Sequence, residues 1–240
     1  MPVIWTDKTE MHAAFITREI EKMGSRFMSV TNQEESTDAL KALDNNRKIA
    51  SDYLKKPNIG LCMGKQVHSA RIAYVRRPGV IENTDGLVTD KPGLAIGVLV
   101  ADCAAVLIAD PVNKIVAAVH AGWRGAIEGI LSEAILQMEK IGAEPDLMHV
   151  YVSPCISRQS FEVGNEVAAQ FPERYVDRSW EKPHVDLRGF ILQELKKAGV
   201  SLESLIQEDK CTMTHPETLH SFRRDGAESG RMLAVVVLSD

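Results

Sequence analysis

The chain has 240 residues, of which 45% are hydrophobic and 25% are charged, a composition typical of a globular protein with a sizeable core. Its net charge of -5 at pH 7 argues against nucleic acid or an anionic membrane as a partner. The longest apolar stretch, residues 94–101, is too short to span a bilayer, and no secretory signal is expected at the first residues.

Four cysteines, at positions 62, 103, 155 and 211, are scattered without a C-x-x-C pair. We therefore expect no disulfide framework and predict a protein of the reducing cytoplasm. Cys62, Cys155 and Cys211 are expected to pack in the core. Because no internal repeat or linker-like segment is visible, residues 1–240 are predicted to form a single domain, and the sequence does not indicate its oligomeric state.

The pattern of apolar and polar residues predicts the order of the secondary-structure elements. Strands are expected at residues 12–18, 59–63, 71–75, 87–89, 94–100, 104–109, 115–119, 148–152 and 231–238. Helices are expected from Ser36 or Thr37 to Leu54, after Gly125 as far as Met138, at 165–170, and from the capping residue Asp186 to Gly199. Strands outnumber helices, which favours an α+β fold with mixed sheets and outer helices.

The segment from Ile115 to Ile135, IVAAVHAGWRGAIEGILSEAI, joins a strand that is apolar on both faces to an amphipathic helix. Such a strand is expected inside a sheet that is covered on both sides. His120 falls where the strand gives way to a glycine-rich turn, and open sheets that carry helices often build their sites at such points. We therefore expect functional groups to converge on His120.

His68 and Cys103 occupy comparable polar breaks in apolar segments. Together with His120 they would supply two imidazoles and a thiolate, a donor set that zinc accepts. Three protein ligands leave one position for water, whose pKa zinc lowers towards neutrality. Spacing alone leaves two alternatives open. The three residues could simply pack in the core, or Cys103 could be a nucleophile with His120 as its base.

The turn after His120 has the features of an anion site. Gly122 and Gly125 allow the backbone to approach a ligand closely, and the helix start offers N–H groups with a partial positive charge. Arg124 has a planar fork that suits phosphate, with a solvated side chain as the alternative. Cations and glycines also cluster at residues 221–231, where a solvated loop with an Arg–Asp pair is a more common arrangement than an anion site.

Seven motifs, in this order, resemble those of the YfiH/YlmD-like proteins, a family also named laccase-domain purine nucleoside phosphorylases or "polyphenol oxidases". They are K-Q-V-H at 65–68, T-D-G-L-V-T at 84–89, A-D-C at 101–103, V-H-A-G-W-R-G at 119–125, S-P-C-I at 153–156, F-E-V-G at 161–164, and F-R-R-D-G at 222–226 with G-R at 230–231. The H-A-G-W-R-G string is highly specific, and the resemblance covers nearly the whole chain.

The resemblance implies a zinc-dependent enzyme with a fold similar to an α/β/β/α sandwich. Members of the family are associated with phosphorolysis of adenosine, inosine, guanosine and 5'-methylthioadenosine, and with deamination of adenosine. The family's metal ligands fall on His68, Cys103 and His120 of this chain. The implied partners are a small-molecule nucleoside and phosphate.

The residue pattern and the resemblance together assign the site. The predicted catalytic residues are Asp102, Cys103, His120 and Arg124. The predicted substrate- or phosphate-binding residues are Lys65, Gln66, Gly122 and Arg124. For Asp102 we expect a role in orienting a metal ligand or moving a proton, with a purely structural role as the alternative.

Other functions stay open. Copper-dependent phenol oxidation is suggested by one family name, and copper(II) generally outcompetes zinc for such ligands. However, seven histidines without an H-x-H pair are poorly suited to a multicopper cluster. A metal-free cysteine hydrolase would use Cys103 and His120, and a non-enzymatic nucleotide-binding protein is a third alternative.

The chain departs from the family pattern at one place. The family usually carries a Gly-Gly-Val-Ser stretch soon after its Thr-Arg, whereas Thr17 and Arg18 are followed here by EIEKMGSRFMSV. A difference in this loop can change the shape of the substrate entrance. The substrate preference is therefore not fixed by the resemblance.

Overall fold

The computed structural model describes residues 3–5, 11–18 and 36–239, and within them the chain forms two six-stranded mixed sheets and a two-stranded ribbon. Sheet A has the order β1 (Val3–Trp5), β2 (Met11–Ile16), β14 (Met232–Leu238), β7 (Leu94–Val100), β3 (Gly60–Gly64), β5 (Gly79–Ile81). Sheet B has the order β13 (Leu205–Gln207), β10 (His149–Val152), β8 (Ala104–Asp110), β9 (Ile115–Ala121), β6 (Gly86–Thr89), β4 (Ile72–Tyr74). The ribbon pairs β11 (Val176–Asp177) with β12 (His184–Val185).

The helices differ greatly in length. The α-helices are α1 (Ser36–Leu54), α2 (Trp123–Ile127), α3 (Ile130–Glu139), α4 (Asn165–Ala168), α5 (Leu187–Lys197) and α6 (Phe222–Asp225). Short 3-10 helices lie at η2 (Pro145–Leu147), η3 (Glu173–Tyr175), η4 (Leu202–Ser204) and η5 (Gly226–Glu228). No helix in the described ranges is both long and apolar enough to cross a membrane.

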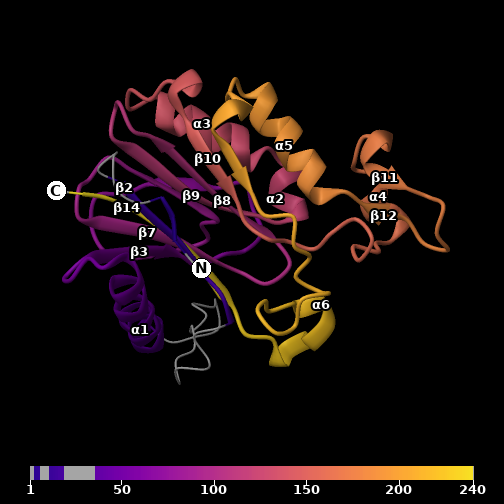
Figure 1. The fold of residues 1–240 in the computed structure, drawn as a ribbon, viewed down its shortest axis with the longest axis horizontal. Coiled ribbons are helices and arrows are strands. Elements are labelled where there is room, and N and C mark those ends of the chain that lie inside the picture. Colours follow the sequence, from indigo (N-terminus) through magenta and orange to yellow (C-terminus); the bar gives the residue numbers. More distant parts are fainter. Residues whose placement is uncertain (1–2, 6–10, 19–35, 240) are drawn as a thin grey trace.

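The sheets pack face to face, with helices on their outer faces (Figure 1). Phe15 of sheet A and Tyr151 of sheet B meet in the apolar layer between the sheets, with ring centroids 6.2 Å apart. Helix α1 covers the outer face of sheet A through an apolar stripe that includes Leu43 and Leu54. Helices α3 and α5 cover sheet B in the same way. The predicted α/β/β/α sandwich with mixed sheets is therefore confirmed.

Strand β9 lies in the interior of sheet B, between β8 and β6, and all seven of its residues are buried. Its residues alternate between two apolar layers: Ala117 packs under the helices, and Ala118 packs between the sheets. This explains why the sequence is apolar on both faces. His120 points to the same face of the strand as Ala118. Its imidazole therefore lies at the end of the layer between the two sheets.

Two differences from the predicted boundaries affect the region around His120. Strand β9 runs on through Ala121, so His120 lies inside the strand rather than after it. The helix expected after Gly125 is divided into two helices. The division falls at Gly129, which adopts a left-handed conformation with φ 88° and so interrupts the run of helical residues. Helix α2 is consequently a single short turn, whose dipole can contribute little to anion binding.

Three of the four cysteines are buried, as expected from the sequence: Cys62, Cys155 and Cys211. Asp186 caps α5, as predicted, because its Oδ1 accepts a hydrogen bond of 2.9 Å from the backbone N–H of Gly189. The segment after Arg18, where the family's Gly-Gly-Val-Ser stretch is missing, lies outside the described residues.

Candidate metal centre and active site

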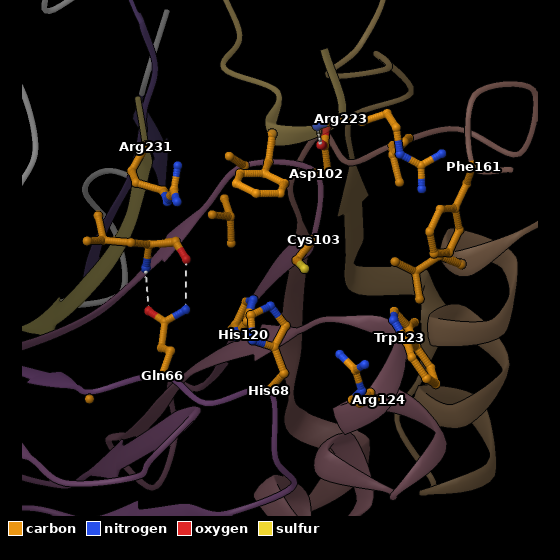
Figure 2. A pocket seen from close by; sticks show the side chains of 17 residues that line it. Gln66, His68, Asp102, Cys103, His120, Trp123, Arg124, Phe161, Arg223 and Arg231 are labelled. Atoms are coloured by element: carbon orange, nitrogen blue, oxygen red, sulfur yellow. Dashed lines mark hydrogen bonds between the residues drawn. The ribbon is translucent and has the colours of Figure 1, made fainter. Parts of the chain in front are cut away.

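The structure brings His68, Cys103 and His120 together at one end of the sandwich (Figure 2). His68 lies in the loop after β3 of sheet A, and His120 lies in β9 of sheet B. Cys103 lies in the turn that leads from β7 of sheet A to β8 of sheet B. Their potential ligand atoms all lie within 4.8 Å of one another. Both sheets therefore contribute to the same cluster.

Asp85, which the sequence singled out only as part of the T-D-G-L-V-T motif, fixes both histidines. Its Oδ1 accepts hydrogen bonds of 2.8 Å from Nδ1 of His120 and 2.8 Å from the backbone N–H of His68. Its Oδ2 accepts from the backbone N–H and the hydroxyl of Ser69, each at 2.8 Å, and from the N–H of Val67 at 3.1 Å. One fully buried carboxylate thus orients the ring of His120 and the loop that carries His68.

The backbone at His68 requires this support. His68 has a φ of 63°, in the left-handed region that residues with a side chain rarely adopt. The hydrogen bonds from three consecutive backbone N–H groups to Asp85 hold the loop in this conformation. His68 is thereby turned towards the edge of the His120 ring, with ring centroids 4.8 Å apart.

The cluster stabilises the charged forms of Cys103 and His120, although both side chains are largely shielded from solvent. Burial by itself would raise the pKa of the Cys103 thiol, but the positive charge and hydrogen bonds of His120, followed by those of His68, lower it. Burial would likewise lower the pKa of His120, but the Cys103 thiolate and the Asp85 carboxylate raise it. The site therefore favours a thiolate at Cys103, the form that binds a metal or acts as a nucleophile.

The donor set fits a divalent metal ion such as zinc. Zinc bonds to histidine nitrogen and cysteine sulfur at about 2.0–2.3 Å, so the three donors can reach one ion after a small side-chain movement. The pairing of His120 with Asp85 leaves Nε2 of that histidine for a ligand bond, as is usual for metal-binding histidines. Within the described part of the chain, no other group of three histidine, cysteine or acidic residues is placed to hold a metal.

Gly122 leaves the space that the cluster occupies. A Cβ atom at this position would lie 3.0 Å from Sγ of Cys103 and 3.1 Å from Cδ2 of His68. The φ of Gly122 is -76°, which any residue can adopt, so steric space and not conformational freedom explains the glycine. Gly122 thus contributes through its missing side chain, and it is not among the residues that line the cavity described next.

A cavity of about 490 Å³ lies beside the cluster, and His68, Cys103 and His120 form part of its wall. Three pairs of an arginine and an aromatic residue line it, with each guanidinium near a ring face: Arg124 with Trp123 at 4.5 Å, Arg223 with Phe161 at 5.7 Å, and Arg231 with Phe222 at 5.9 Å. Apolar lining comes from Leu99, Val100, Ile156 and Leu187. The cavity therefore offers flat apolar surfaces and positive charge beside the potential metal ligands.

The residues predicted to bind substrate are distributed differently. Arg124 lines the cavity, as does Gln66. The amide of Gln66, however, donates to the carbonyl of Leu99 and accepts from its N–H, both at 2.8 Å, so it ties the loop after β3 to β7 (Figure 2). Lys65 does not line the cavity, and its ammonium pairs with Glu82 at 2.8 Å. We therefore assign no phosphate contact to Lys65.

The remaining predicted residues lie around the turn that carries Cys103. Asp102 lines the cavity, but its carboxylate oxygens bind Thr212 and the backbone of Arg223 and not a side chain of the cluster. Of the cations at residues 221–231, Arg224 pairs with Asp225 at 2.7 Å, as expected for an Arg–Asp pair. Its neighbour Arg223 instead reaches the cavity, a role that was not expected from the sequence.

Comparison with known proteins gives the family of the chain. Residues 12–239 match the family model described as multi-copper polyphenol oxidoreductase laccase. A purine nucleoside phosphorylase of Deinococcus radiodurans is 31% identical over 242 aligned positions, which cover 99% of this chain and 93% of the relative. The adenosine deaminase RL5, from an unknown prokaryotic organism, is 32% identical over 212 positions that cover 81% of this chain and 80% of the relative.

The fold is also similar to a solved structure, that of the protein YfiH of Bacillus licheniformis. The TM-score is 0.84 at 24% identity, and the match covers 99% of this chain and 97% of YfiH. This match supports the fold alone. Because the family model and a relative that is 31% identical both extend over nearly all of its residues, the chain belongs to the YfiH-like family of laccase-domain proteins.

Proposed function

We propose that the chain is a zinc-dependent purine nucleoside phosphorylase that acts on adenosine, inosine, guanosine and 5'-methylthioadenosine and that also deaminates adenosine. The observation that carries the proposal is the position of His68, Cys103 and His120 beside a cavity with aromatic and cationic walls. Relatives named purine nucleoside phosphorylase and adenosine deaminase support the choice of nucleosides as substrates.

His68, Cys103 and His120 would hold the zinc ion. When bound, the ion supplies Lewis-acid chemistry at the cluster. Asp85 orients the His120 ring for this purpose and keeps the His68 loop in place. The rest of the site belongs to residues that bind and orient the nucleoside and the phosphate.

Arg124 is the residue best placed to bind phosphate. Within the described part of the chain, its guanidinium lies 4.5 Å from the Trp123 ring centroid and has neither a carboxylate nor a carbonyl partner. Stacking on the indole fixes the plane of the guanidinium and leaves its N–H groups for an anion. A guanidinium held in this way can donate two parallel hydrogen bonds to phosphate.

The aromatic walls suit the purine ring. Trp123, Phe161 and Phe222 all line the cavity, and flat rings stack well on aromatic faces. The cavity volume of about 490 Å³ falls within the range of about 300–1,000 Å³ that is typical of small-molecule sites. The site can therefore enclose most of a nucleoside with a phosphate beside it.

The two reactions differ in the bond that breaks. In phosphorolysis, a phosphate oxygen bonds to C1' of the ribose while the bond from C1' to the purine nitrogen breaks. The purine leaves with the electron pair and is protonated, which gives the free base and ribose 1-phosphate. In deamination, water replaces the amino group at C6 of adenosine, which gives inosine and ammonia.

The proposal is tested by assaying purified protein with adenosine or inosine, with and without phosphate, and by measuring its metal content. We expect free base and ribose 1-phosphate, and activity that chelation abolishes and zinc restores. Cys103→Ala and His120→Ala should each lose metal and activity, whereas Cys62→Ala, a buried cysteine in sheet A, should keep both. Arg124→Gln should raise KM for phosphate and retain the metal.

Other outcomes would identify a different function. Full turnover by Cys103→Ala and His120→Ala would refute the metal assignment. Phenol oxidation by protein that contains copper would favour the oxidase. Activity that survives chelation but is lost on alkylation with iodoacetamide would favour a metal-free cysteine hydrolase. Saturable nucleoside binding without turnover would show a binding protein.

A further inference from the structure

Asp102 has an unusual position. It lies in the turn between β7 and β8, immediately before Cys103, and its φ is 88°. Its side chain lies beside Arg223, on the far side of Cys103 from the two histidines (Figure 2). The left-handed backbone at this residue therefore directs the carboxylate away from the potential metal ligands and towards the C-terminal part of the chain.

Both carboxylate oxygens of Asp102 accept short hydrogen bonds from that part of the chain. Oδ1 accepts from the hydroxyl of Thr212 at 2.5 Å, and Oδ2 accepts from the backbone N–H of Arg223 at 2.6 Å. The partners are 110 and 121 residues away in the sequence. Hydrogen bonds to a charged acceptor are stronger than neutral ones, so these two bonds hold the turn at Asp102 tightly to the C-terminal part of the chain.

The connection extends into the cavity wall. Nη1 of Arg223 donates to the carbonyl of Glu162 at 3.0 Å and to that of Ser160 at 3.4 Å, and its guanidinium lies 5.7 Å from the Phe161 ring centroid. Through the N–H of Arg223, Asp102 therefore supports two aromatic residues of the wall, Phe161 and the neighbouring Phe222.

Arg224 also stabilises the part of the chain between Thr212 and Arg223. Its guanidinium donates to the carbonyls of Thr212 at 2.9 Å and Leu219 at 3.0 Å, while Asp225 accepts from it at 2.7 Å. The residues from Thr212 to Arg223 thus form one braced segment. Asp102 is the side chain that ties this segment to the turn that carries Cys103.

We propose that Asp102 is a positioning residue that holds the wall formed by Arg223, Phe222 and Phe161 at a fixed place relative to Cys103, and that it does not transfer a proton. The wall and the metal ligands would then face the nucleoside from opposite sides. The proposal deepens the proposed function and rests on it for the identity of the ligand. Its structural part does not depend on that identity.

Asp102→Asn separates positioning from proton transfer. The asparagine Oδ1 can accept from the N–H of Arg223, and its Nδ2 can donate to the Thr212 hydroxyl, which is able to accept as well as donate. The variant thus keeps both connections but cannot act as a general base. We expect kcat and KM for inosine within about threefold of the wild type, whereas loss of a general acid or base would lower kcat by about 10²–10⁴-fold.

Asp102→Ala removes both connections. We expect it to raise KM for inosine by about tenfold or more, with a smaller change in kcat and an unchanged zinc content. Thr212→Val keeps the shape of the side chain but removes one of the two hydrogen bonds, so its KM should lie between the wild type and Asp102→Ala. A loss of kcat in Asp102→Asn as large as that in Asp102→Ala, with KM unchanged, would overturn the proposal.

Hydrogen exchange tests the positioning without any assay of activity. Asp102→Ala should speed amide exchange in residues 212–223, and Asp102→Asn should leave it at the wild-type rate. Equal protection in all three proteins would refute the positioning role. If the wild type turned over no nucleoside while the exchange pattern appeared as expected, only the proposed function would fail.

Discussion

At the scale of single residues, the Asp85 carboxylate is the group on which the candidate metal site most depends. It accepts five hydrogen bonds, one of them from the His120 ring and three from the backbone of the loop that carries His68. Groups that orient a metal-binding histidine typically change metal affinity by about 10–100-fold when they are removed. Asp85 supports two ligands at once, so its loss should have an effect at the upper end of this range.

We therefore expect Asp85→Ala to weaken zinc binding by about 100-fold, measured by competition with a chromophoric chelator. Ser69→Ala is the matched control, because it removes one of the five hydrogen bonds and leaves the carboxylate in place. Its zinc affinity should change by less than about tenfold. Equal affinity in Asp85→Ala and the wild type would show that the cluster does not need this carboxylate.

At the scale of elements, two glycines flank the short helix α2 and have different tasks. Gly122 leaves room for Cys103 and His68, because a Cβ atom there would press against both side chains. Gly129 has open space around it, but its φ of 88° separates α2 from α3. One glycine is thus needed for packing against the cluster, and the other is needed for backbone conformation.

Replacing each glycine by alanine should separate the two tasks. Gly122→Ala should displace Cys103 or His68 by a few tenths of an ångström and lower zinc affinity, with little effect on the backbone. Gly129→Ala should lower the free energy of unfolding by about 1 kcal/mol, because alanine is strained at positive φ, and should leave zinc affinity unchanged. Chelator competition and urea unfolding measure the two effects. The assignment is wrong if Gly129→Ala lowers zinc affinity more than Gly122→Ala does.

At the scale of the whole molecule, the apolar layer between the sheets is one of the large buried cores that stabilise the fold, beside those under the helices. Leu107 of β8 lies in this layer and is 0% exposed. Leu107→Ala should lower the free energy of unfolding by about 2–5 kcal/mol, because it leaves a cavity in a packed core. Val112→Ala, at a position that is 66% exposed, should change it by less than about 0.5 kcal/mol. Urea denaturation of both variants checks the difference.

The sequence predicted those parts of the structure that depend on neighbouring residues. The helix from Ser36 to Leu54 and the capped helix after Asp186 have local signals, and both are present. The break at Gly129 was missed because apolar residues keep their helical spacing on both sides of it, and a lone glycine does not by itself end such a pattern.

Contacts between distant residues could not be predicted in the same way. The convergence of His68, Cys103 and His120 was expected from their polar positions and from the family resemblance. The role of Asp85 was not expected from the sequence, because this residue acts on partners that are 16 to 35 residues away. The segments that meet at Asp102 are more than 100 residues apart, so only the fold shows that they lie together.

The three potential metal ligands come from both sheets and from the turn that joins them, and this has a consequence for biosynthesis. No short segment of the unfolded chain carries the complete donor set, so the sandwich must assemble before an ion can be held. Loading with the proposed metal would then be the last step of maturation, in contrast to zinc fingers, which fold only around their ion. Protein refolded in the presence of a chelator should therefore regain native circular dichroism first and accept zinc afterwards.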